Sequence, residues 1–290
     1  MKYLTFLFIL TTFLSCTSPD SPPAAVQVAP QRRIISTLPS ITEVLFDIGL
    51  GNRIVGDSSF TKYPPEAANI DKIGGLFDMN HEKIVSLKPD LIVMSVENQT
   101  LPPALSVPVL IVDHRTLDGV LNSYLIIGKF FGADILAAAE QKQQELISKL
   151  NDVTVSMVKG QAPIRTLVCI DRSYGTGRIQ NMFVAGADSF LSEAVKRAGG
   201  INVAESIGLL APMLSAEGVI GLTPDVIIDI QVNGTDTAQS VADWQSLGNS
   251  VPAVKNRRIL TLTDDFATIP GPRTPILIEK IARCFESIEP

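Results

Sequence analysis

Short apolar runs alternate with helix-like stretches along most of the chain, beginning at Arg32. In the first half we interpret four runs as buried strands, namely 34–38, 54–56, 91–94 and 109–112. Residues 40–49 place apolar side chains on one helical face behind Ser40 as an N-cap, and residues 81–87 predict a second helix. Strand, helix and strand in this order predict a parallel sheet covered by helices.

The second half of the chain repeats part of the first. Residues 82–93 align with residues 217–228 at a constant offset, and both contain an acidic residue, an apolar helix, a Pro-Asp turn and an apolar strand. Arg33 precedes the first strand of the first half, and Arg165 precedes a similar strand in the second. Chance matching of helix-plus-strand units is the alternative explanation. The repeat predicts two α/β lobes of similar plan, at 32–132 and 159–290.

The longest stretch without glycine or proline, 133–158, separates these lobes and carries apolar residues at near-helical spacing. As one helix it would be about 39 Å long, enough to cross from one lobe to the other. The predicted fold class is therefore α/β, with two Rossmann-like lobes that have parallel-type central sheets, one long α-helix joining them, and a ligand cleft between them. Bending a straight helix breaks backbone hydrogen bonds, so we expect the lobes to open little.

The first residues have the pattern of an export signal. An almost unbroken apolar run, 3–14, follows a single lysine and is too short to span a bilayer comfortably. It ends at Cys16, in a sequence that resembles the bacterial lipobox, so we predict a lipoprotein signal peptide at 1–16 and lipidation of this cysteine. Ordinary secretion, with Cys16 a passenger, is the alternative. Residues 17–31 are rich in Pro, Ser and Ala and predict a disordered tether.

Composition narrows the possible functions. The 290 residues are 46% hydrophobic, and the net charge of −6 without any basic run argues against nucleic acid as a partner. Two histidines are too few for a zinc or manganese receptor, so no metal site is predicted. Residues 175–180 resemble a dinucleotide loop but lack the third glycine, and no nucleophile elbow or P-loop occurs. We interpret Cys169 and Cys284 as buried, inert thiols.

Six segments in order carry a family resemblance: 33–43, 63–67, 74–82, 88–92, 183–186 and 198–202. From about Arg32 to Ser287 the chain resembles the helical-backbone, or class III, periplasmic substrate-binding proteins of ABC importers for vitamin B12, haem and ferric siderophores. The Tyr-Pro-Pro and Met-Asn-x-Glu segments are most similar to the B12-binding branch. The resemblance implies a monomer that is not an enzyme and has no intrinsic cofactor.

The resemblance further implies an extracytoplasmic protein, lipid-anchored to a bacterial membrane, that captures a small-molecule metal chelate and delivers it to a permease dimer. A corrinoid is the expected ligand, and haem or a ferric siderophore is the alternative. The B12 branch often places tryptophan where Phe77 lies, whereas the one tryptophan here, Trp244, lies elsewhere. A secreted α/β enzyme is the alternative of a different class.

Ligand contacts are expected in the loops at the carboxyl ends of the strands, where open α/β sheets bind ligands. Aromatic faces suited to a corrin or porphyrin ring, together with other side chains of these loops, give the predicted ligand-binding set: Phe60, Tyr63, Phe77, Met79, Arg172, Tyr174, Met213 and Phe266. Arg172 could meet a ligand carboxylate or phosphate, or pair with Asp171 or Asp188. For haem, Tyr63, Tyr174 and His81 are conceivable iron ligands.

Two carboxylates are candidates for docking to the transporter. Proteins of this class use one exposed glutamate on each lobe to contact arginines of the transporter, and by position these are Glu82 and Glu217 here. Two separated carboxylates on one face would orient the encounter and speed it more than they add affinity. The alternative is that each carboxylate only favours a helix N-terminus.

Overall fold

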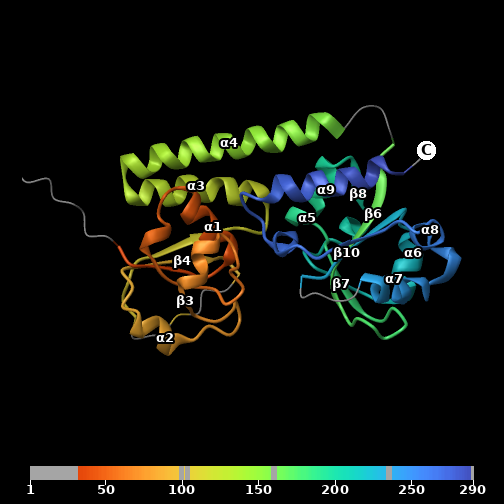
Figure 1. Ribbon diagram of the computed structural model, residues 1–290, viewed down its shortest axis with the longest axis horizontal. Coiled ribbons are helices and arrows are strands. Elements are labelled where there is room, and N and C mark those ends of the chain that lie inside the picture. Colours follow the sequence, from red (N-terminus) through yellow and green to blue (C-terminus); the bar gives the residue numbers. More distant parts are fainter. Residues whose placement is uncertain (1–31, 98–100, 102–104, 158–161, 233–236, 289–290) are drawn as a thin grey trace, which may run out of the picture. The chain divides into compact units, whose positions relative to one another are not determined.

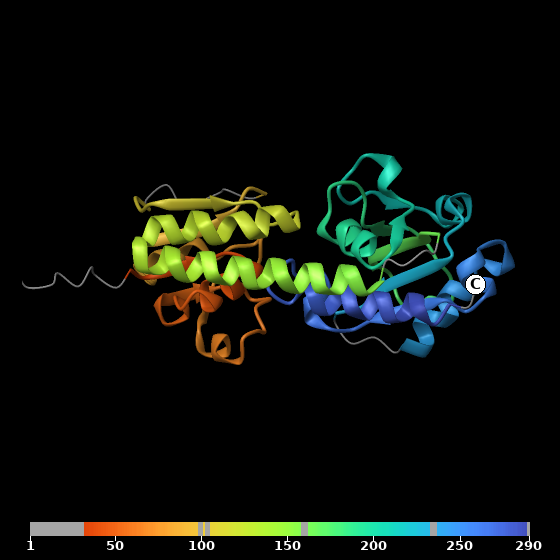
Figure 2. The same ribbon diagram turned by 90° about the horizontal axis from the view of Figure 1, so that it is seen from above.

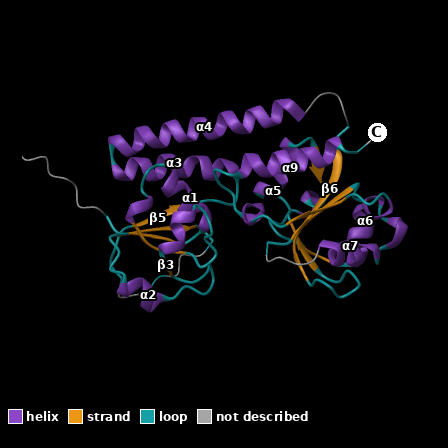
Figure 3. Ribbon diagram, in the orientation of Figure 1, coloured by secondary structure: helices purple, strands orange, loops and turns teal. Residues whose placement is uncertain are grey.

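The strands gather into two separate sheets, each covered by helices (Figures 1 and 3). In the computed structural model, the residues described are 32–97, 101, 105–157, 162–232 and 237–288. The predicted signal peptide, Cys16, the tether and Val158 lie outside them. None of the helices within these ranges is long and apolar enough to cross a membrane.

The first lobe is built on a five-stranded sheet in the order β3-β2-β1-β4-β5, and every neighbouring pair is parallel. All five residues of β4 are buried, as expected of a parallel strand covered on both faces. The strands are β1 (Ile34–Ser36), β2 (Ile54–Asp57), β3 (Asp71–Lys72), β4 (Leu91–Ser95) and β5 (Val109–Val112). The helices are α1 (Pro39–Asp47), η1 (Gly51–Arg53), η2 (Pro65–Asn69), α2 (His81–Ser86) and α3 (Leu117–Phe131).

One predicted helix start is wrong. Leu38 occupies the N-cap position of α1 without a side-chain cap, and Pro39 follows it as the first helical residue. Proline is well tolerated there because its missing N–H would have had no intrahelical partner. Ser40 therefore lies inside the first turn of α1, where it is buried. The helix ends at Asp47, two residues before the predicted end.

The second lobe has a mixed six-stranded sheet, which is parallel at its centre. The path runs β11-β10-β6-β7-β9, and β8 also pairs with β6; the pairs of β7 with β6 and with β9 are antiparallel. The strands are β6 (Ile164–Arg172), β7 (Met182–Val184), β8 (Gly200–Asn202), β9 (Met213–Leu214), β10 (Val226–Ile230) and β11 (Ile259–Leu262). The helices are α5 (Phe190–Arg197), η3 (Glu205–Ile207), α6 (Ala216–Leu222), α7 (Thr237–Gln245), η4 (Gly248–Ser250), α8 (Pro252–Lys255), η5 (Asp265–Thr268) and α9 (Thr274–Glu286).

A long helix, α4 (Ala133–Met157), connects β6 to the elements before it. It packs against α3 of the first lobe and against α5 and α9 of the second, and Figure 2 shows it running alongside α3 and then α9. One apolar cluster includes α1 and α3 residues, buried α4 residues and α9 residues without interruption. The fold thus has the predicted α/β class, and its two lobes share a core beneath these helices.

The internal repeat has a structural counterpart. In each lobe a residue with left-handed backbone follows a short helix: Lys88 (φ 46°) lies two residues after the end of α2, and Thr223 (φ 44°) directly follows α6. A Pro-Asp turn follows, and then the strand β4 or β10. Each of these strands is the parallel neighbour of its lobe's first strand, β1 or β6. The repeated segments therefore form equivalent units.

A tightly packed glycine offers a test of the fold around the end of β5. A methyl group on Gly119, in the first turn of α3, would lie 1.8 Å from the carbonyl oxygen of Asp113. The backbone must move to accept it, so we expect Gly119→Ala to lower the free energy of unfolding by about 1–3 kcal/mol in a denaturant titration.

The matched control is Gly221, which is also helical but has open space within 4 Å of an added methyl group. Alanine has less conformational entropy to lose in a helix than glycine, so Gly221→Ala should be neutral or stabilising, by at most about 1 kcal/mol. Equal effects of the two substitutions would contradict the packing described for Gly119.

Candidate functional site

A cavity of about 770 Å³ lies between the two lobes, at the carboxyl ends of both sheets. Loops after β1, β2, β4 and β5 line it from one side, and loops after β6, β10 and β11 line it from the other. This volume falls within the range of small-molecule sites. The cavity therefore lies at the carboxyl ends of the strands, where the sequence predicted the ligand-binding site.

Two of the predicted aromatic residues line this cavity, one from each lobe. Phe60 follows β2 and exposes 66% of its surface, and Tyr174 follows β6 and is half-buried. The Tyr174 hydroxyl donates a hydrogen bond to the carbonyl oxygen of Ile230 at 2.9 Å, which holds the ring in place. Burial raises the pKa of this phenol, so Tyr174 offers a flat face and not a phenolate.

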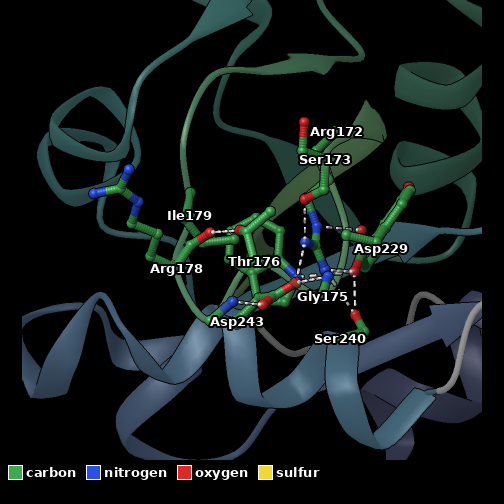
Figure 4. A network of polar contacts seen from close by, with 12 residues as sticks. Arg172, Ser173, Gly175, Thr176, Arg178, Ile179, Asp229, Ser240 and Asp243 are labelled. Atoms are coloured by element: carbon green, nitrogen blue, oxygen red, sulfur yellow. Dashed lines mark hydrogen bonds and ion pairs between the residues drawn. The ribbon is translucent and has the colours of Figure 1, made fainter.

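Arg172, whose guanidinium carbon lies 4.4 Å from the centre of the Tyr174 ring, is buried among acceptors (Figure 4). Its Nε and one terminal nitrogen donate to the two carboxylate oxygens of Asp229 at 3.3 and 2.8 Å. That terminal nitrogen also donates to the Ser240 hydroxyl at 2.9 Å. The other terminal nitrogen donates to Asp243 at 2.8 Å and to the carbonyl of Ser173 at 3.0 Å. All five N–H groups of the guanidinium are thus engaged.

The second of these carboxylates also shapes the loop that carries Tyr174. Asp243 accepts hydrogen bonds from the backbone N–H groups of Gly175 and Gly177 at 2.8 and 2.7 Å. Burial raises the pKa of Asp243, but Arg172 and the two amides outweigh it and hold the pKa below its usual value. The glycine-rich segment that resembled a dinucleotide loop is therefore a turn tied to α7.

A buried histidine lines the first-lobe wall of the cavity. His114 follows β5 and is 3% exposed, and its Nδ1 lies 2.9 Å from the Ser40 hydroxyl of α1. Its Nε2 has no hydrogen-bond partner among the described residues. Burial lowers the pKa of His114 to about 4, so the ring is neutral at pH 7.

Several predicted contact residues do not reach the cavity. Phe77 is 85% exposed but does not line it, and Met213 lies on the exposed face of β9. Met79 packs against the apolar cluster of the first lobe, and Phe266 is 9% exposed and belongs to the main core. These four side chains do not line the cavity, because position in a loop does not set the direction of a side chain.

Two further expectations change. Tyr63 does not line the cavity, and its ring lies 4.4 Å from the guanidinium carbon of Arg273. Arg172 is at the cavity, but both proposed partners, Asp171 and Asp188, were wrong. Its partners lie 57 and 71 residues further along the chain, beyond the reach of local pattern.

Some lining residues were missed by the sequence reasoning. His114 and Arg115 lie two and three residues after the predicted strand 109–112, so the expectation that ligands bind at the carboxyl ends of strands would have found them. The residues 189–191 and 268–270 also line the cavity, from the start of α5 and from the loop before α9, and no sequence signal marks them. Cys169 is buried in β6, as predicted, whereas Cys284 is half-buried in α9.

The two candidate docking carboxylates have matching local structures. Glu82 and Glu217 are both exposed in the first turn of their helices, α2 and α6. Asn80 caps one helix by accepting from the N–H of Lys83, and Ser215 caps the other in the same way. Each carboxylate therefore lies in the first turn of a helix whose start is capped by a polar side chain.

The C-terminal ends of these two helices are also held alike. The Arg33 side chain donates to the carbonyl oxygens of Leu87 and Lys88, at 2.8 and 3.2 Å. In the second lobe, Arg165 donates to the carbonyl of Leu222 at 2.7 Å and to that of Thr223 at 3.4 Å. Each helix is thus tied at its end by an arginine at the start of the lobe's first strand: Arg33 directly precedes β1, and Arg165 is the second residue of β6.

Comparison with known proteins identifies relatives of the whole chain. The sequence matches the periplasmic binding protein family over residues 34–266. A vitamin B12-binding protein of Pectobacterium atrosepticum is 28% identical, over 96% of this chain and 95% of the relative. The uncharacterized ABC transporter substrate-binding lipoprotein YvrC of Bacillus subtilis is 26% identical, over 89% and 80%. The apo structure of the periplasmic heme-binding protein RhuT from Roseiflexus is 27% identical, with a TM-score of 0.70 over 88% and 97%.

The buried imidazole predicts a pH dependence of stability. The pKa of His114 is about 4 in the fold, against an ordinary value of 6.5, so the unfolded chain binds more protons between these pH values. The contribution of His114 to stability is complete above pH 6.5 and is lost as the pH falls through 4. We expect His114→Gln to remove roughly 3 kcal/mol of the fall in unfolding free energy between pH 7 and pH 4. An unchanged pH profile in denaturant titrations would contradict the assignment.

Proposed function

Because the chain belongs to the periplasmic binding protein family, we propose that it captures a corrinoid, a vitamin B12-like molecule, and delivers it to the permease of an ABC importer. Its relatives are extracytoplasmic substrate-binding proteins of transporters, and the chain is a binding protein of this type and not an enzyme. The proposed identity of the ligand is inferred from the residues that line the cavity between the lobes.

The observation that carries the proposal is the cavity between the lobes and its two aromatic faces. A volume of about 770 Å³ suits a bulky ligand, and Phe60 and Tyr174 present rings from opposite lobes. Aromatic rings contribute large apolar area and stack on flat conjugated systems. A macrocycle held between these rings would contact both lobes at once.

The charges at the cavity favour a ligand without strong negative charge. Arg172 uses all of its donors on the protein, and Arg115 forms a two-pronged ion pair with Asp113 at 2.9 and 2.6 Å. Both guanidinium charges are therefore compensated by carboxylates before any ligand arrives. A corrinoid carries neutral amide side chains on its ring. Haem carries two propionates, and the cavity lining offers only Lys62 as a cation without an ion pair among the described residues.

Haem or a ferric siderophore is the second candidate, and His114 is the observation in its favour. His114 lines the cavity as a neutral imidazole, the form that binds metals, and its Nε2 has no hydrogen-bond partner in the described part of the chain. The tyrosine candidates for iron are less suitable, because the Tyr174 hydroxyl is engaged and Tyr63 does not line the cavity. His81 does not line it either.

The partner we propose is a permease dimer that contacts both lobes through Glu82 and Glu217. The support is that each exposed carboxylate is carried by the same local unit, with a capped helix start and an arginine-tied helix end. Two like charges at equivalent positions suit a partner with two equivalent basic patches. The backbone N–H of Glu217 and the Ser215 hydroxyl lower the pKa of this carboxyl group, so it is charged at pH 7.

Attachment to a membrane through lipidated Cys16 completes the proposal. It rests on the sequence pattern, since this residue lies outside the described part of the chain, and on the lipoprotein YvrC among the relatives. A monomer would then act at the membrane surface, within reach of its permease.

Ligand capture is tested by native mass spectrometry of the folded protein with cyanocobalamin, cobinamide, haem and a ferric siderophore in turn. We expect a one-to-one complex with the corrinoids. Phe60→Ala should weaken it by about tenfold, because a stacked ring is lost.

Phe77→Ala is the matched control, since this exposed aromatic residue of the same lobe does not line the cavity and its loss should leave the affinity unchanged. Binding of haem or a siderophore in preference to corrinoids would refute the ligand named here. Equal losses from the two phenylalanine variants would refute the site.

Docking is tested by the double substitution Glu82→Ala and Glu217→Ala. We expect ligand affinity to be retained while uptake through the cognate importer in proteoliposomes slows on the order of tenfold, because charge steers the encounter. The control double variant, Asp118→Ala with Glu140→Ala, removes the same charge from exposed positions on α3 and α4. Equal uptake by the two double variants would rule out the docking role.

A further inference from the structure

The segment between β11 and α9 forms part of the cavity wall and ends at Arg273. Asp265, Thr268, Ile269 and Pro270 from this segment line the cavity. Arg273 then occupies the N-cap position of α9. Its side chain is 11% exposed, although a guanidinium is always charged.

Arg273 pairs with one carboxylate from each lobe. Its Nε donates to the two oxygens of Glu43 at 3.2 and 3.1 Å, and a terminal nitrogen reaches Glu43 at 2.6 Å. The two terminal nitrogens donate to Asp265 at 2.8 and 3.0 Å. Glu43 lies on α1 of the first lobe, 230 residues away in sequence, and its side chain is 1% exposed.

Aromatic rings complete the surroundings of this guanidinium. Its central carbon lies 4.4 Å from the Tyr63 ring centre in the first lobe and 5.4 Å from that of Phe266 in the second. Buried charges require partners with good geometry, and a planar fork with two carboxylates in reach fixes orientation as well as distance. Arg273 is therefore held by residues of both lobes in a single arrangement.

This arrangement joins opposite walls of the ligand cavity. The first turn of α1 contributes Pro39 and Ser40 to one wall, and Glu43 lies one turn further along the same helix. Asp265 belongs to the opposite wall. We propose that Arg273 is a positioning residue that fixes the separation of the two walls, and with it the width of the cavity, by binding Glu43 and Asp265 together.

A nearby ion pair provides a control for the loss of the Arg273 contacts. Lys280 of α9 pairs with Asp264 at 2.6 Å, on the same segment but entirely within the second lobe. Loss of this pair removes a contact from the segment without removing a link between lobes. A variant without this ion pair therefore distinguishes a general loosening of the segment from a change in the width of the cavity.

The test measures the distance between the lobes in the protein without ligand, so it stands independently of the ligand proposed above. Spin labels are attached at Glu66→Cys in the first lobe and Gln245→Cys in α7 of the second, both exposed positions, in a background with Cys16→Ser and Cys284→Ser. Electron paramagnetic resonance then gives the distribution of distances between the two labels. Arg273→Lys keeps the charge but loses the fork, and Glu43→Gln keeps the side-chain shape but loses the charge.

We expect a single narrow distribution in the parent protein and in Lys280→Gln. Arg273→Lys and Glu43→Gln should broaden the distribution and shift its mean to longer distances, at temperatures where circular dichroism shows both variants folded. Glu43→Gln leaves Arg273 paired with Asp265, so this variant keeps the test valid if Arg273→Lys does not fold. A distribution in Glu43→Gln that matches the parent protein would overturn the proposal, and so would equal broadening in Lys280→Gln.

Discussion

The separation of the two sheets is the constraint on which the rest of this structure depends. Each sheet directs the loops at its carboxyl ends into the same cavity, so the cavity exists only while the lobes keep their spacing. The apolar cluster beneath α3, α4 and α9 runs through both lobes and cannot be divided without exposing it to water. A continuous helix such as α4 resists bending because its backbone hydrogen bonds would break.

Two buried arginines in different parts of the fold both have their charge compensated by a pair of carboxylates. Arg172 and Arg273 each bind two carboxylates, and each lies against two aromatic rings. Arg172 works within the second lobe, where it supports the ring of Tyr174 and the turn tied to Asp243. Arg273 works between the lobes. In both cases carboxylates of the protein compensate the positive charge of the guanidinium.

Sequence pattern predicted the features that local physics determines. The buried strands, the long α4 helix and the repeat of a helix, a Pro-Asp turn and a strand all follow from apolar periodicity and turn chemistry, and the structure contains them. Ser40 was misread as a cap because Pro39 can itself begin the helix. The aromatic residues could be assigned to loops but not to a direction, so Phe60 and Tyr174 reach the cavity while Phe77 and Phe266 do not. Contacts such as Arg273 with Glu43 join distant segments, and no local signal encodes them.

The central claim is that the cavity is largely formed before the ligand arrives, because the connection between the lobes is stiff. Small-angle X-ray scattering of the free protein and of the protein saturated with cyanocobalamin tests it most directly. We expect a complex whose radius of gyration differs from that of the free protein by no more than about 1 Å, as in other pre-organised complexes. A complex that is several ångströms more compact would show a hinge between the lobes and would contradict a cavity formed before the ligand arrives.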